Sequence, residues 1–117
     1  MDQINKREHA RYPLTLEVDI FGHRQIFSAT TEDISASGIR FKTRRDLNNG
    51  QDYSVALRSQ LASLPIMQGR VVRSEADALN SPKTVAIRFL EPNRSISDIA
   101  KLELRLQQGQ KRSDPIL

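Results

Sequence analysis

The sequence predicts an all-β fold: a six-stranded antiparallel β-barrel with a C-terminal α-helix. Short segments in which apolar and polar residues alternate are separated by turn residues, and one later segment has helical spacing. The 117 residues suffice for one core but not two. We therefore expect a flexible arm over 1–12, the barrel over 13–92, the helix over 93–108 and a disordered tail over 109–117.

The first three strands are predicted to form a meander. Apolar residues alternate with polar ones over 14–20, which is the clearest strand in the chain. A turn at Gly22 leads into a second strand over about 25–32, and residues 38–43 (GIRFKT) alternate again.

Three more strands follow a strong turn signal at residues 48–50 (NNG). Alternation returns over 53–57, over 69–74 (GRVVRS) and over 84–89 (TVAIRF). Six short strands joined by turns are typical of a small antiparallel barrel.

The helix is predicted after Pro92. Ser95 and Asp98 resemble a capping box, and Gly109 suits the position that follows a helix. The apolar stripe of this helix comprises Ile96, Ile99, Leu102 and Leu106. Two interpretations stay open: the stripe packs on the barrel or closes one of its ends, or it mediates self-association.

Composition narrows the function classes. The absence of cysteine excludes disulfides and thiolate chemistry, and the sequence shows neither a signal peptide nor a membrane-spanning run, so we expect a cytoplasmic protein without membrane insertion. Eighteen Lys and Arg against fourteen Asp and Glu give a net charge of +4, and thirteen of the bases are Arg. This bias favours anionic partners that a planar guanidinium can bind.

The clearest chemical motif is the segment DISASG, between the second and third strands. Asp33 can accept two N–H bonds of the kind that a guanine edge offers, and Ser35 can bond a phosphate or a base. Gly38 permits a positive φ or the close approach of a ligand. The pattern Asp/Asn-x-Ser-x-x-Gly is expected by chance only ~0.05 times in this composition. Taken alone, the same residues also suit an ordinary turn.

The arm carries an Arg-x-x-x-Arg pair, Arg7 and Arg11. Alone the pair is weak evidence, because ~1.4 such pairs are expected by chance in a chain this rich in arginine. Lys6 precedes the pair and His9 lies within it.

The order of these motifs resembles the PilZ domain, a bacterial receptor module for the second messenger cyclic di-GMP. The similarity covers nearly the whole chain, from the arginine pair through the Asp-x-Ser-x-x-Gly turn to the following Ile-Arg-Phe strand. The resemblance implies that the two arginines clasp phosphates and guanine edges while the turn surrounds a guanine. The implied ligand-binding residues are Arg7, Arg11, Asp33, Ser35 and Gly38.

Five further residues are weaker candidates for ligand contact: Lys6, His9, Ser37, Arg40 and Arg73. Some family members place a bulky or aromatic residue after a Gly-x-Val motif on a strand, and here Arg73 stands at that point. It either stacks on a base or is a solvated strand residue. Lys6 is compatible with an added phosphate contact, and the ligand stoichiometry stays open.

The resemblance predicts a receptor that reorders its arm on ligand binding and signals to a downstream protein. Ordering the arm costs entropy, which the charge-assisted bonds of a dianionic ligand can offset. We expect no enzyme activity, cofactor or metal site, because the two histidines lie far apart and no nucleophile is paired with a base in the sequence.

Two other functions fit parts of the sequence. A PilZ-fold adaptor would bind proteins independently of nucleotide, and the intact five-residue motif argues against it. A basic barrel could bind nucleic acid through Arg40, Lys42, Arg44 and Arg45. Two Tyr and four Phe leave little for base stacking, so we expect no nucleic-acid partner.

Overall fold

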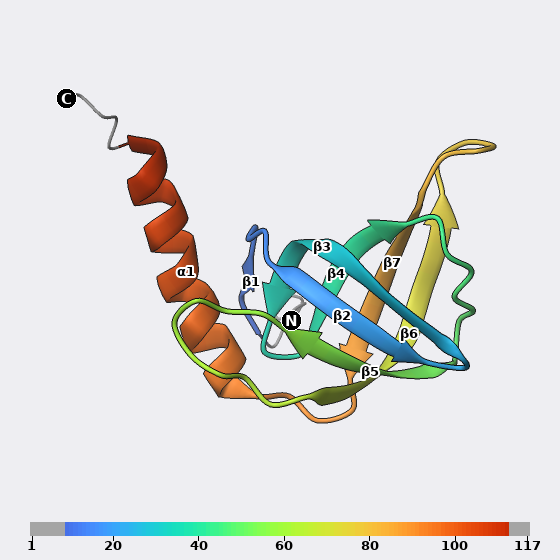
Figure 1. Ribbon diagram of the computed structural model, residues 1–117, viewed down its shortest axis with the longest axis horizontal. Helices are drawn as coiled ribbons and strands as arrows, with labels where there is room; N and C mark the ends of the chain where they lie inside the picture. The colour runs from blue at the N-terminus through green and yellow to red at the C-terminus, as the bar shows by residue number, and fades with distance from the viewer. Residues whose placement is uncertain (1–8, 113–117) are drawn as a thin grey trace, which may run out of the picture.

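The computed structural model describes residues 9–112 (Figure 1). Its elements, in chain order, are β1 (Arg11–Tyr12), β2 (Glu17–Gly22), β3 (Gln25–Ser35), β4 (Gly38–Thr43), β5 (Asp52–Leu57), β6 (Met67–Ala76), β7 (Lys83–Phe89) and α1 (Arg94–Arg112).

Strands β2 to β7 close into a six-stranded antiparallel barrel. Their order is β3-β2-β5-β6-β7-β4, and the additional pairing of β3 with β4 closes the sheet. The short strand β1 pairs with the end of β3, outside this ring. The predicted barrel with its C-terminal helix is confirmed, as is the meander of its first three strands.

The core fills the inside of the barrel because each strand turns every second side chain inward. Val18, Ile20 and Val55 are fully buried, and residues between them face outward. Burying an aliphatic side chain of this size contributes about 1.5–3 kcal/mol.

The first strand begins later than the alternation suggests. Leu14 and Leu16 are buried as predicted, but β2 starts at Glu17. The Thr31 hydroxyl donates to the Leu14 carbonyl and accepts from the Leu16 N–H. The Thr31 side chain therefore takes the place of a paired strand for the Leu14 carbonyl and the Leu16 N–H.

Strand β3 is longer than the predicted 25–32. It pairs with β2 as far as Thr30, and then continues along β4 after an irregularity between Thr31 and Asp33. The change of partner lets the strand run on to Ser35. Asp33 and Ser35 therefore lie in a strand rather than in a turn.

The helix starts one residue later and ends four residues later than the predicted 93–108. Asn93 caps it, since its side-chain oxygen accepts from the Ser95 N–H at 2.8 Å, so the predicted capping box at Ser95 is wrong. Gly109 does not end the helix, because a glycine inside a helix costs only about 1 kcal/mol. Residues 1–8 of the predicted arm and 113–117 of the predicted tail lie outside the described residues.

The predicted apolar stripe of α1 divides between two faces. Ile96 and Ala100 are buried, and α1 contacts β1 and β3. Leu102 and Leu106 remain 46% and 42% exposed. At 3.6 residues per turn Leu102 lies roughly 120° from Ile96, so one barrel surface does not cover both. Packing on the barrel is confirmed for Ile96, whereas Leu102 and Leu106 are only partly covered.

Candidate ligand-binding face

The DISASG segment, residues 33–38, is the signature turn, and it forms a tight connection from the end of β3 to the start of β4. The Ser35 hydroxyl accepts from the Ser37 N–H at 3.1 Å and lies 3.0 Å from the Ser37 hydroxyl. The Ala36 carbonyl accepts from the N–H of Asn93, and the Ser37 carbonyl accepts from the N–H of Phe89, both at 2.8 Å. The motif is thus hydrogen-bonded to the end of β7 and to the capping residue of α1.

Gly38 is required by its neighbour strand. A Cβ at this position would lie 2.3 Å from the Ile87 carbonyl oxygen of β7. Within residues 9–112 the positive-φ glycines are Gly22 and Gly50, so the predicted use of a positive φ at Gly38 is wrong. The close approach at Gly38 is made by protein backbone.

Asp33 lies between two guanidinium groups. The Asp33 side chain points to the outer side of the barrel wall, but the residue is only 6% exposed. Arg11 Nη1 lies 3.0 Å from Oδ1, and Arg40 Nη2 lies 3.1 Å from Oδ2. Arg11 reaches this point because β1 pairs it with Ser35. A buried carboxylate needs such partners, since an unpaired charge away from water is costly.

The charges continue outward from Asp33 along β3 and β4. Glu32 lies 3.4 Å from Arg40 Nε and 3.9 Å from Lys42 Nζ. Arg40 Nε is buried and makes no hydrogen bond within residues 9–112, because the Glu32 contact has ion-pair distance without hydrogen-bond geometry. Positive and negative groups therefore alternate from Lys42 to Arg11.

The sheet register lines up outer-face residues across four strands. The paired positions form two adjacent rows, Asp33–Arg40–Ala86–Arg73 and Ser35–Gly38–Arg88–Arg70. Neighbouring strands lie about 4.8 Å apart, so Arg73 is roughly 10 Å from Arg40 along the first row. The structure therefore brings Arg11, Asp33, Ser35, Arg40 and Arg73 onto one face.

The arginines of this face differ in how they are held. Arg70 binds Asp52 through Nε at 2.7 Å and Nη2 at 3.2 Å, and these bonds lower the pKa of Asp52 and raise that of Arg70. Arg73 and Arg88 are exposed and form no ion pair in the described part of the chain. Arg88 was missed by sequence reasoning: its strand was predicted, but only the register shows that it faces Gly38.

The other predicted residues are Lys6, Arg7 and His9. Lys6 and Arg7 lie outside the described residues, and His9 is partly exposed, two residues before β1. Between residues 9 and 112 no group of three or more His, Asp or Glu side chains is placed to share a metal ion.

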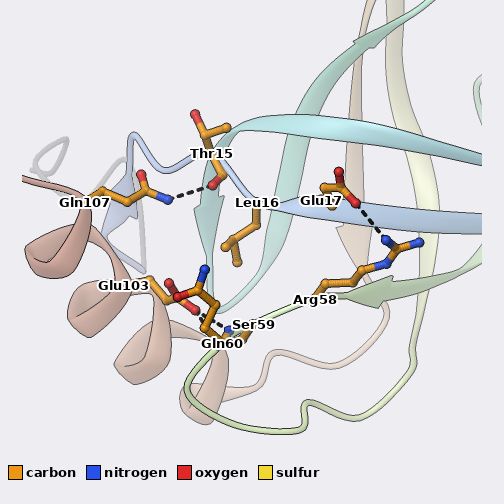
Figure 2. Close-up of a pocket in the computed structure, with 8 residues that line it drawn as sticks. All are labelled: Thr15, Leu16, Glu17, Arg58, Ser59, Gln60, Glu103 and Gln107. Carbon is orange, nitrogen blue, oxygen red and sulfur yellow. Dashed lines mark hydrogen bonds and ion pairs between the residues drawn. The ribbon is translucent and has the colours of Figure 1, made fainter. Parts of the chain in front are cut away.

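A cleft lies between α1 and the barrel, apart from the face that carries Asp33 (Figure 2). This cleft, about 320 Å³ in volume, has Glu103 at its base. Glu103 is only 3% exposed. Its carboxylate accepts hydrogen bonds from the Ser59 hydroxyl at 2.6 Å and from the Gln60 N–H at 2.8 Å. Gln107 donates to the Thr15 carbonyl at 2.8 Å. These bonds hold α1 against the barrel, and sequence reasoning missed Glu103 because a helical glutamate is usually exposed.

An ion-pair network at the edge of this cleft makes stability depend on pH. Asp19 accepts from the Ser28 hydroxyl and from Arg58, and these bonds lower the pKa of Asp19 below 3.8. Its stabilising contribution is complete above the unfolded pKa and is lost as the pH falls through the lower folded value. We expect the free energy of urea unfolding to fall less for Arg58→Met than for the parent as the pH is lowered below about 5.

The effect is small because the pair is exposed to solvent. Arg44→Met is the matched control, since Arg44 binds only the Asn80 carbonyl among the described residues. Equal pH slopes for the parent and Arg58→Met would contradict this assignment.

The fold and the motif together define a class: a small antiparallel barrel whose signature turn and arginine-bearing strand meet on the outer face. The chain belongs to the PilZ domain family, whose model matches residues 5–106. No curated protein matches the chain significantly.

Solved structures show the same fold at low sequence identity. The Bacillus subtilis inhibitor of motility, MotI/DgrA, has a TM-score of 0.72 at 18% identity, with 96% of this chain covered. The PilZ domain of YcgR from Escherichia coli, solved with c-di-GMP, has a TM-score of 0.65 at 13% identity, with 92% of this chain covered. MrkH of K. pneumonia, solved as a c-di-GMP complex, has a TM-score of 0.63 at 17% identity, with 93% of this chain covered. The chain spans 99% of the YcgR domain but 56% of the MotI and MrkH chains.

Among residues 9–112 no helix is long and apolar enough to cross a membrane.

Proposed function

We propose that this chain is a receptor for cyclic di-GMP and binds it on the outer face that carries Asp33. One observation carries the proposal: the buried Asp33 carboxylate lies between Arg11 and Arg40, beside the signature turn of a PilZ-family chain. YcgR and MrkH, which share the fold, were solved with this ligand.

The contacts suggest how the ligand would be held. The Watson–Crick edge of guanine offers N1–H and N2–H donors, which suit a carboxylate that accepts two hydrogen bonds. In the structure Arg11 donates a hydrogen bond to Asp33 Oδ1, and one of the two guanine donors would bond to the same oxygen. Exchange of the guanidinium for the guanine edge would free Arg11 to bind a phosphate, with Arg7 beside it. The arm would thereby reorder on binding.

The unpaired cations of the face suit a dianionic ligand. Arg73 and Arg88 lie in the two register rows that begin at Asp33 and Ser35. A guanidinium can bind a phosphate through two bonds or stack on a base. We assign Arg88 to this site together with the predicted Arg73.

The same site supports binding rather than catalysis. The Ser35 hydroxyl is engaged with Ser37, and no histidine or free carboxylate among the described residues lies beside it as a base. We therefore propose a cytoplasmic receptor without cofactor or enzyme activity. It would signal to a protein partner through changes of its surface.

A nucleic-acid interface on the basic strand is disfavoured by the contacts of its arginines. Arg44 donates to the Asn80 carbonyl at 2.8 Å, and the Arg45 guanidinium lies 5.3 Å from the centre of the Phe27 ring. Lys42 lies near Glu32, and Arg40 binds Asp33. These cations serve the barrel itself.

Calorimetric titration tests the proposal. We expect cyclic di-GMP to bind at micromolar concentration or tighter, GTP and cyclic GMP to bind far more weakly, and Arg11→Ala to reduce affinity at least about 10-fold through loss of charge-assisted bonds. Arg24→Gly is the matched control. It removes the same charge at the opposite end of β3, at a positive φ that glycine accepts.

No heat from cyclic di-GMP at millimolar concentration would overturn the receptor proposal. The nucleotide-independent adaptor would then become the leading function. Equal affinity of Arg11→Ala and the parent would instead show that the ligand binds elsewhere.

A further inference from the structure

Helix α1 has a second apolar stripe, which lies on one flank of the helix beside its barrel-facing side. It consists of Leu102 and Leu106, both nearly half exposed, and the partly buried Ile99 at its edge. The spacings of three and four residues are those of a helix–helix seam. Figure 1 shows α1 at one side of the barrel, with its C-terminal half extending beyond the strands.

The contacts between α1 and the barrel leave this stripe available. Ile96 and Ala100 are buried, and Leu102 lies roughly 120° or more from each of them around the helix. Because Glu103 binds the Gln60 N–H, the loop after β5 runs along the helix, and the next residue, Leu61, is 41% exposed.

The charges beside the stripe are self-complementary. Asp98 and Arg105 border it on the same side, seven residues apart, with Leu102 near the midpoint between them. Both are exposed, and neither forms an ion pair within residues 9–112. In an antiparallel pair of identical helices, Asp98 of one copy lies opposite Arg105 of the other, and twofold symmetry makes the contact twice.

We propose that a second copy of this chain packs on this stripe, with the two α1 helices antiparallel and Leu102 near the twofold axis. A partner helix of uniform charge would leave either Asp98 or Arg105 against a like charge, whereas a second copy satisfies both. The seam is about two turns long, so the interface is small and we expect a dimer dissociation constant on the order of 10–100 μM. The two ligand-binding faces lie outside this seam.

Sedimentation velocity of the full chain, from about 10 μM to about 1 mM, tests the dimer. We expect a concentration-dependent shift from monomer to dimer. Leu102→Glu should weaken association at least about 10-fold, because it places a charge at the centre of the seam. Leu79→Glu is the matched control: Leu79 is 91% exposed between β6 and β7, away from α1, and its substitution should leave the equilibrium unchanged.

Charge exchange tests the antiparallel arrangement. Asp98→Arg and Arg105→Asp should each weaken the dimer, and the double variant should restore it, since the pair is re-formed with reversed charges. A monomer up to about 1 mM would overturn the proposal. So would an association that Leu102→Glu leaves intact, an assembly larger than a dimer, or a double variant as weak as the singles.

Discussion

Asp33→Ala is expected to reduce the affinity for cyclic di-GMP at least about 100-fold. The substitution removes the carboxylate that would accept two guanine donors, and it leaves Arg11 and Arg40 without the anion that positions them. Hydrogen bonds to a charged group contribute about 1.5–3 kcal/mol each, and a loss of about 2.7 kcal/mol corresponds to 100-fold in affinity. Calorimetric titration of the purified variant measures the change.

The matched control is Asp46→Ala. Asp46 has an exposed side chain and pairs with Lys83, so its loss changes the net charge equally while leaving the site intact. Both variants should fold, because solvent can hydrate the partly exposed Arg11 and Arg40 once Asp33 is gone. Retained affinity in Asp33→Ala, with normal urea unfolding, would show that binding needs neither a contact of this carboxylate with the ligand nor its positioning of Arg11 and Arg40.

Gly38→Ala is expected to lower the free energy of unfolding by about 2–4 kcal/mol, the range for overpacking combined with lost backbone bonds. The added methyl group would lie 2.3 Å from the Ile87 carbonyl oxygen and 3.2 Å from the Arg88 Cα, so β4 and β7 must separate. These two strands pair next to the signature turn. Equilibrium urea unfolding measures the loss.

Gly109→Ala serves as the control for Gly38→Ala. Nothing lies within 4 Å of a Cβ built at Gly109, and alanine favours helix by about 1 kcal/mol, so this variant should be slightly more stable than the parent. If Gly38→Ala unfolds like the parent but binds no ligand, the glycine serves ligand approach and the packing argument is wrong.

The strands were predictable because one face of the barrel wall is buried in the core and the other is exposed to solvent. Phe41 and Ile87 alternate with exposed or partly exposed residues, and this alternation is local sequence information. The length of β3 was not predictable, since it depends on a change of partner strand after Thr30. The helix start was missed because the capping side chain of Asn93 competes in sequence with an equally plausible Ser95.

The site was predictable only where a motif is contiguous. Asp33 and Ser35 belong to one short pattern, and the structure places Arg11 beside them. Arg88 lies opposite Gly38 because of the register between β4 and β7, and these strands are separated by 39 residues in sequence. The burial of Glu103 depends likewise on where the loop after β5 crosses the helix.

The hydrogen bond from the Asn93 N–H to the Ala36 carbonyl joins the start of α1 directly to the signature turn. The helix has 19 residues and is therefore about 28 Å long. A tilt of about 5° at Asn93 would displace its far end by roughly 2 Å, a lever that magnifies a small backbone shift. A protein touching only the last turn of α1 would then register events at Asp33 without approaching the nucleotide.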